Sequence, residues 1–193
     1  MTILKATEHL EKKLQVSFCT DVFSLINDHA KIITYSMGDT ILWEGDTASH
    51  LYYLIKGVVR GYYIDRDGND ITKCFCAEED FFSTQGYRTG TSATFTIECL
   101  ENCNCVQLPY TIIEHILQMD KELCSIVSHL FQNEIENQEL RCKELMLLNA
   151  KERYLAFCKD NPQLQNRIAL KYIASYIGVR AASLSRIRKE SKS

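Results

Sequence analysis

The feature that most constrains the fold is a series of short β-type runs between residues 31 and 108. These runs are rich in β-branched and aromatic residues: Lys31–Tyr35, Thr40–Trp43, Leu51–Ile55, Val58–Ile64, Asp70–Cys76, Thr94–Cys99 and Cys103–Leu108. Turn signals such as Gly38-Asp39 and Asp67-Gly68-Asn69 separate them. Because Gly, Asn and Asp supply the positive φ of tight hairpins, the pattern predicts an antiparallel sandwich, jelly roll or barrel.

Helical patterns flank this β region on both sides, so the predicted fold class is α+β. Apolar residues recur at helical spacing before residue 30 and again from about 110 to 147. In the second region one stripe steps by three or four residues: Val127, Phe131, Ile135, Gln138, Cys142 and Leu145. A long helix with such a stripe packs on its own domain or pairs with a second copy. Its position after the β region favours pairing. A shorter amphipathic helix is predicted over Ala150–Lys159.

The last segment has the pattern of a helix–turn–helix. Leu170, Ile173, Ala174 and Ile177 form one apolar face, and Gly178 can take the left-handed conformation that ends a helix. Leu184 and Ile187 then give a second helix its inner face. The outward side chains are polar and basic, which suits a DNA major groove. An ordinary helical hairpin is the structural alternative.

Charge is divided unevenly along the chain, although the net charge is only −3. The last 28 residues carry seven basic side chains against one acidic, a balance of +6, and the remaining 165 carry −9. An acidic body with a basic end favours an anionic partner at that end.

The nine cysteines contain no CxxC pair, and their odd number in a chain without a secretory signal argues against a disulfide framework. We interpret them as small buried residues, with redox sensing as the alternative. No metal site and no cofactor are predicted. No apolar run approaches the ~18 residues of a membrane span, so a cytoplasmic protein without membrane contact is expected.

Taken together, these residues resemble the Crp/Fnr family of bacterial transcription regulators. The stretch from Gly38 through Trp43-Glu44-Gly45-Asp46 to Leu51-Tyr52-Tyr53-Leu54-Ile55-Lys56-Gly57 is similar to the β-roll signature of that family. Asp67-Gly68 matches the next hairpin. The end of the chain, Tyr172-Ile173-Ala174 to Leu184-Ser185-Arg186, is similar to its helix–turn–helix.

The resemblance implies three parts: a helix plus β-roll sensor over 1–110, a long dimerisation helix region over 111–147 and a DNA-binding domain over 148–193. It also implies a homodimer on a pseudo-palindromic operator in double-stranded DNA, with a small-molecule effector in a cyclic-nucleotide-binding-like roll. The sequence ends four residues after Lys189, before the place of the family's β-hairpin wing, so either this subgroup lacks the wing or the sequence is cut there.

Two departures from the family concern the effector. Members that bind cyclic nucleotides carry a Gly-Glu pair where this chain has Ser83-Thr84, and an Arg near the position of Ala93. Without that guanidinium nothing offsets the desolvation of a phosphate, so we expect no response to cyclic AMP. Candidate residues for another, anionic effector are Ser83, Thr84, Arg88, Thr91 and Ser92.

The expected DNA contacts lie in the last two helices, with Arg186 as the candidate for a bidentate contact to guanine. Ala181 and Ala182 replace residues that in the family read a G·C-rich half-site. The full set of candidates is Lys171, Tyr172, Arg180, Ala182, Ser183, Ser185, Arg186, Arg188 and Lys189.

Two alternatives to an effector-controlled regulator remain open from the sequence. One is a regulator on the same scaffold that senses cysteine oxidation. The other is a cupin-like metalloenzyme, which needs His and carboxylate ligands converging on a metal. The five histidines are scattered, at His9, His29, His50, His115 and His129, and the expected protein is not an enzyme. His50 and His115 are the histidines considered as haem ligands.

Overall fold

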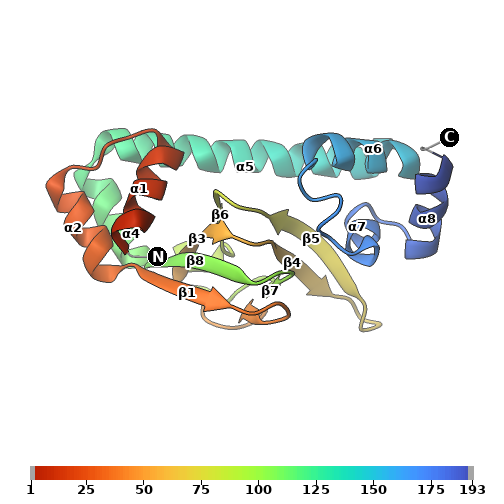
Figure 1. Ribbon diagram of the computed structural model, residues 1–193, viewed down its shortest axis with the longest axis horizontal. Helices are drawn as coiled ribbons and strands as arrows, with labels where there is room; N and C mark the ends of the chain where they lie inside the picture. The colour runs from red at the N-terminus through yellow and green to blue at the C-terminus, as the bar shows by residue number, and fades with distance from the viewer. Residues whose placement is uncertain (1–2, 191–193) are drawn as a thin grey trace. The chain divides into compact units, whose positions relative to one another are not determined.

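The computed structural model describes residues 3–190, which form two compact units (Figure 1). The sheet unit contains residues 3–62 and 75–129, and the helical unit contains residues 63–74 and 130–190. Three elements, β4 (Val59–Ile64), β5 (Asp70–Cys76) and α5 (Lys121–Leu147), pass from one unit into the other. The predicted division at 110/111 and 147/148 stays a prediction.

Two four-stranded antiparallel sheets make the β-roll, which confirms the predicted jelly-roll fold. One sheet has the order β1-β8-β3-β6 and the other β2-β7-β4-β5. The strands are β1 Lys31–Tyr35, β2 Thr40–Leu42, β3 His50–Lys56, β4 Val59–Ile64, β5, β6 Asp80–Phe82, β7 Thr96–Cys99 and β8 Cys103–Pro109. In the first sheet β8 lies between β1 and β3, with Ile33 opposite Cys105 and Tyr53 opposite Val106.

Strand β6 and the short helix α3 (Gly86–Thr89) lie in a segment without a predicted element. β6 has only three residues, too few to show a period of two, and it follows Glu79 in a left-handed conformation (φ 63°). It pairs with β3, where Tyr52 opposes Phe82 and the two rings stack at 5.1 Å. The predicted strand from Thr94 begins two residues later, at Thr96.

Three helices cover the roll with apolar side chains. They are α1 (Ile3–Leu14), α2 (Thr20–His29) and α4 (Tyr110–Met119), and their buried residues meet Tyr53 and Val106 of the sheet in one core cluster. The predicted spacing of Leu10, Val22 and Ile26 is explained by this core, in which all three are buried.

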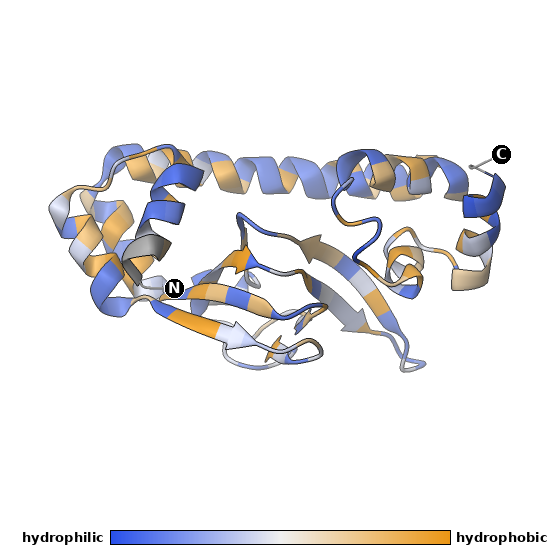
Figure 2. Cartoon of the chain, viewed as in Figure 1, coloured by the Kyte–Doolittle hydropathy of each residue, from blue (hydrophilic) through white to orange (hydrophobic). Residues whose placement is uncertain are grey.

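The helical pattern predicted from 110 to 147 is divided into α4 and α5 at Asp120. The Asp120 N–H donates to the Ile116 carbonyl, which ends α4. The Asp120 carboxylate accepts from the Leu123 N–H at 2.9 Å, which caps the first turn of α5. One residue therefore ends one helix with its backbone and begins the next with its side chain. Figure 2 shows apolar and polar residues alternating along α5.

The end of the helical unit contains α6 (Ala150–Asp160), α7 (Leu170–Tyr176) and α8 (Ala181–Glu190). Asn149 and Glu152 form a capping box that starts α6. Between α7 and α8 the chain turns at Gly178, whose φ of 71° is left-handed as predicted. Across residues 3–190, every helix is either too short or too polar to cross a bilayer.

Candidate nucleic-acid interface and effector loop

The turn between α7 and α8 is fixed by backbone hydrogen bonds and by an apolar contact. The Gly178 N–H donates to the Ser175 carbonyl at 3.1 Å and the Val179 N–H to the Ala174 carbonyl at 2.9 Å. Below the turn, the buried side chains of the two helices are Ile173, Ala174, Ile177 and Leu184. Small Ala174 lets the helices approach closely. The two helices therefore have the arrangement of a helix–turn–helix.

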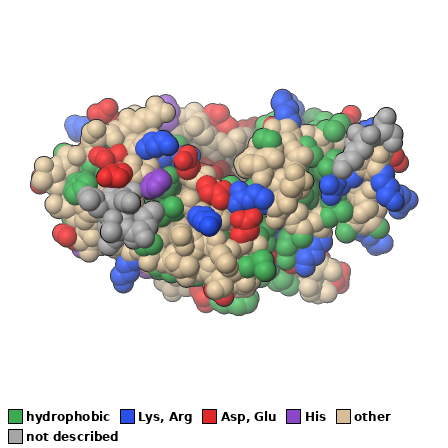
Figure 3. All heavy atoms as spheres, viewed as in Figure 1, with side chains coloured by type: hydrophobic (Ala, Val, Ile, Leu, Met, Phe, Trp, Pro, Cys, Tyr) green, Lys and Arg blue, Asp and Glu red, His purple; other side chains and the backbone are tan. Residues whose placement is uncertain are grey.

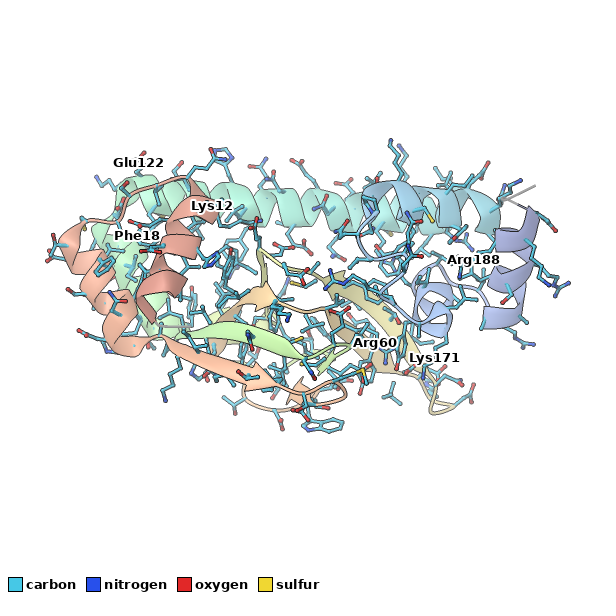
Figure 4. The ribbon with its side chains drawn as sticks, viewed as in Figure 1. Lys12, Phe18, Arg60, Glu122, Lys171 and Arg188 are labelled. Atoms are coloured by element: carbon cyan, nitrogen blue, oxygen red, sulfur yellow. The ribbon has the colours of Figure 1, made fainter. Side chains whose placement is uncertain are left out.

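Four of the predicted basic contacts project into solvent around this motif. Arg180, Arg186 and Lys189 are exposed at and along α8, and Lys171 is exposed on α7. Figure 3 shows Lys and Arg side chains gathered over this end of the chain, and Figure 4 labels Lys171. Exposed cations of this kind can neutralise phosphates or reach base edges.

The smaller candidates on α8 differ in exposure. Ala182 is exposed, whereas Ser183 and Ser185 are half-buried. Tyr172 is also half-buried, with the Lys171 Nζ 4.6 Å from its ring centre. The structure therefore brings the predicted residues together on two adjacent helices, and their contacts with DNA stay predictions.

Arg188 differs from the other candidates because its guanidinium already has a protein partner. It is half-buried and forms a hydrogen bond with the Tyr154 hydroxyl of α6; Figure 4 labels Arg188 on α8. Burial, followed by the hydrogen bond to Cys158, raises the pKa of Tyr154, and Arg188 opposes that rise. This geometry gives Arg188 a role in packing α8 on α6.

In the loop that holds the candidate effector residues, 83–92, the hydroxyl of Ser83 is hydrogen-bonded and that of Thr84 is not. The Ser83 hydroxyl donates to the His50 carbonyl at 2.7 Å. The Thr84 hydroxyl is buried and makes no hydrogen bond with any protein group described within residues 3–190. Because a buried polar group without a partner is destabilising, the Thr84 hydroxyl is the one of the two that still has its proton to donate to a ligand.

The other three predicted effector residues lie on the rim of this loop. Arg88, Thr91 and Ser92 are exposed. The Thr91 hydroxyl already pairs with that of Thr89 at 2.7 Å. The loop is closely packed, since a Cβ at Gly86 would collide with the carbonyl oxygens of Thr91 and Ser92. An exposed Arg88 four residues after the buried Thr84 is compatible with an anionic ligand, and that role stays a prediction.

Ala93, at the position where the family's phosphate-binding Arg is expected, is buried. It is 3% exposed, its N–H donates to the Asp46 carbonyl at 2.8 Å, and its carbonyl accepts from Gly45. This side chain carries no charge, and the absence of a phosphate-binding group stays a prediction.

A buried ion pair in the second sheet was not anticipated from the sequence. The Arg60 Nε donates to the Glu98 Oε1 at 2.7 Å, and their side chains are 1% and 18% exposed. The two residues are register partners on β4 and β7. The guanidinium also lies 4.4 Å from the Tyr62 ring centre (Figure 4). One signal was available: each charge interrupts an otherwise apolar β run.

Most of the cysteines near the roll are buried, in agreement with the interpretation as core residues. Cys99, Cys103 and Cys105 are at most 1% exposed. The hydrogen bond that the Cys99 thiol donates to Cys103, followed by burial, raises the pKa of Cys99, and burial raises the pKa of Cys105 to about 12. Cys19 and Cys142 are exposed. The hydrogen bond with Cys99 lowers the pKa of Cys103, but burial keeps all three thiols from solvent, and reactive thiols need exposure.

No group of three or more His, Cys, Asp or Glu side chains within residues 3–190 is placed to hold a metal ion. His50 bonds with the Ser49 hydroxyl at 2.9 Å, and burial, then Lys31, lowers its pKa.

Comparison with known proteins agrees with this architecture. Residues 32–120 match the cyclic nucleotide-binding domain family. The cAMP-activated global transcriptional regulator CRP of Pasteurella multocida is 25% identical over 126 residues, which are 65% of this chain and 60% of that protein. The chain therefore spans less than two thirds of the length of the first curated relatives that it matches.

Two solved structures share the fold. FixK2 from Bradyrhizobium japonicum superposes with a TM-score of 0.76 at 20% identity and covers 83% of each chain. A Crp/Fnr-family protein from Eubacterium rectale has a TM-score of 0.72 at 16% identity and covers 91% of this chain and 84% of its own.

The roll, the long helix and the terminal helix–turn–helix define a protein of the cyclic-nucleotide-binding-domain class with an appended helical unit. Within that class, the chain is similar to transcription regulators of the Crp/Fnr type.

Proposed function

We propose that this protein is a homodimeric, DNA-binding transcription regulator of the Crp/Fnr type and not an enzyme. The observation that carries the proposal is the group of four exposed cations on the two helices of the helix–turn–helix, Lys171, Arg180, Arg186 and Lys189. They lie on the only strongly basic part of an otherwise acidic chain. A recognition helix of this kind enters the major groove, and two of them one DNA turn apart read a pseudo-palindrome.

A salt titration of DNA binding tests this proposal. Fluorescence anisotropy on labelled promoter fragments from 50 to 300 mM salt gives the dependence of log K on log salt. If four cations each neutralise one phosphate, the slope is roughly −3 to −4 per subunit. Lys189→Ala should reduce the magnitude of the slope by about 1. Lys143→Ala, an exposed change on α5, should leave it unchanged. A slope near zero, or no binding to any fragment, contradicts the proposal.

The dimer is proposed to form through α5. Part of the predicted stripe, Ile135, Cys142 and Leu145, is exposed in the single chain, and Ile135 is 67% exposed. A run of exposed apolar side chains on one long helix suits pairing with its twin. Sedimentation should give a dimer for the native chain and a monomer for Ile135→Glu. An Ile135→Glu variant that still sediments as a dimer excludes pairing through this stripe.

The effector is proposed to be an anion other than cyclic AMP, bound near Thr84 and Arg88. Support comes from the unpartnered Thr84 hydroxyl and from Ala93, which offers a phosphate no charge. Titration calorimetry with cyclic AMP should give no heat beyond dilution at millimolar concentration. Saturable binding of cyclic AMP would contradict this part of the proposal.

The two alternatives receive less support from the geometry. A redox sensor needs reactive thiols, and those of the roll core are buried, which leaves exposed Cys19 and Cys142. A metalloenzyme needs converging ligands, and residues 3–190 contain no such cluster. Thiol titration of the native protein, combined with a measurement of DNA affinity, tests the first. A DNA affinity that changes when Cys142 is oxidised would support the redox sensor. Metal analysis of the pure protein tests the second.

A further inference from the structure

The outer edge of strand β5 is occupied by side chains from two helices. β5 is the last strand in the order β2-β7-β4-β5, so one of its edges has no neighbouring strand. Such an edge presents unpaired N–H and C=O groups. The Ser175 hydroxyl of α7 accepts from the Thr72 N–H at 2.8 Å and donates to the Asp70 carbonyl at 3.1 Å.

The two backbone groups that Ser175 bonds belong to one edge. In an antiparallel strand, residues two apart direct their N–H and C=O groups to the same side. Asp70 and Thr72 are two residues apart. The Ser175 hydroxyl donates one hydrogen bond and accepts one, as the backbone of a neighbouring strand would. Thr72 is 1% exposed, so this part of the edge is closed to solvent.

Arg141 of α5 reaches the same edge and the same helix. Its Nη2 donates to the Tyr176 carbonyl at 2.7 Å and contacts the Thr72 carbonyl at 3.5 Å. Its guanidinium carbon lies 3.5 Å from the centre of the Tyr176 ring, in stacking geometry. One side chain therefore holds both the strand edge and the last turn of α7.

A second arginine completes the attachment of this last turn. The Arg153 Nε donates to the Ile177 carbonyl at 2.7 Å, and its Nη1 donates to the Leu148 carbonyl at 2.6 Å. The carbonyls just before the Gly178 turn thus accept from side chains of α5 and α6. Hydrogen bonds to charged donors are directional and stronger than neutral ones, so the turn is fixed in position as well as packed.

We infer that Arg141 and Ser175 are positioning residues: they attach the β4–β5 hairpin to the first helix of the helix–turn–helix. The hairpin thereby helps to set where the reading helix α8 is held. Neither residue is a candidate DNA contact. The inference deepens the proposed function and rests on it, because the position of α8 matters only if α8 reads DNA.

The test uses the full chain with Ser175→Ala and Arg141→Gln. Their matched controls are Ser125→Ala and Lys143→Gln, exposed positions on α5. Amide exchange of the hairpin, residues 63–74, is measured with and without a promoter fragment. In Ser175→Ala the Thr72 amide should exchange roughly fivefold to tenfold faster, because it loses its acceptor. Both variants should bind DNA with a Kd raised roughly 2- to 30-fold, because an unattached α8 must be ordered on binding.

The outcomes separate the inference from the function on which it rests. In the native chain, DNA should change the exchange of residues 63–74, and both variants should reduce that response, whereas the controls keep it. Native-like DNA affinity and an unchanged hairpin response in both variants would overturn the inference while leaving the function intact. If no protein binds DNA, the proposed function fails. Circular dichroism identifies a variant that does not fold, and the other variant then decides.

Discussion

The β-roll and the helix–turn–helix use charged and polar side chains in opposite ways. The roll encloses them: Arg60 pairs with Glu98 inside a sheet, and the Thr84 hydroxyl is buried. The helix–turn–helix presents its cations to solvent, Arg186 and Lys189 among them. In the roll, the removal of a charge should therefore change the stability of the fold. On α8, the exposed cations can contact a partner molecule.

This difference separates two kinds of experimental effect. A substitution of an enclosed polar group changes the free energy of unfolding, because the remaining partner stays buried. A substitution of an exposed cation leaves stability within about 0.5 kcal/mol and changes only what the cation binds. The predictions below test this separation, in order of decreasing effect.

The largest effect is expected from breaking the buried ion pair. Glu98→Leu leaves the Arg60 guanidinium buried without its carboxylate, which is expected to lower the free energy of unfolding by about 3–5 kcal/mol. Denaturant titration measures it. The double variant Arg60→Met/Glu98→Leu should recover much of the loss. A Glu98→Leu protein as stable as the native one would show that charge in the roll is not coupled to folding.

The second effect concerns DNA affinity. Arg186→Ala should weaken binding to the preferred fragment by about 1–3 kcal/mol and reduce the preference for it. The midpoint of thermal unfolding should stay almost unchanged. Parallel anisotropy and melting measurements test both statements. A variant with lowered stability and native DNA affinity would show that Arg186 contributes to folding, as the buried charges of the roll do, and not to DNA binding.

The third effect has the opposite sign to an ordinary core substitution. Thr84→Val removes a buried hydroxyl that has no partner and keeps the shape of the side chain, so stability should rise by about 1 kcal/mol. Thr96 is the control, because its buried hydroxyl accepts from the Glu44 N–H at 3.1 Å. Thr96→Val should lower stability by about 1–3 kcal/mol. Two variants that change in the same direction would contradict the account of Thr84.

The smallest effect is a pH dependence. Because burial and Lys31 lower the pKa of His50, the unfolded chain binds more protons than the folded one as the pH falls through about 6.5. The free energy of unfolding should therefore decrease from pH 7 to pH 6, by less than ~1.4 kcal/mol per pH unit.

His50→Gln should make this part of the profile flatter, and the exposed His129→Gln serves as its matched variant. If the free energy of unfolding has the same slope against pH for the native chain and for His50→Gln between pH 7 and pH 6, His50 does not contribute to the pH dependence of stability.

Much of the fold was predictable because it depends on local patterns. Period-two runs with glycine turns located seven of the eight strands, and helical spacing located the helices that cover the roll. β6 was missed because a three-residue strand has no visible period. The break at Asp120 was missed because its evidence is a capping hydrogen bond, which an apolar stripe does not reveal.

For the candidate sites, the sequence identified the exposed residues better than the buried ones. Arg186 and Lys189 project outward because the apolar positions of α8 determine the opposite face. Partner choice was not predictable: Arg188 bonds with Tyr154 and Arg141 with the Tyr176 carbonyl, and each bond joins segments far apart in sequence. Such pairs depend on tertiary packing, which one sequence does not display.

The alternation of strand β5 has a consequence for how its length can vary. An insertion of one residue between Thr72 and Phe75 would turn the amide of Thr72 to the other side of the strand and present that of a neighbour to Ser175. An insertion of two would restore the same amide to that side, displaced by about 7 Å along the strand. A natural variant therefore has to change the length of this short segment by an even number of residues, and this matters more than which residues the segment contains.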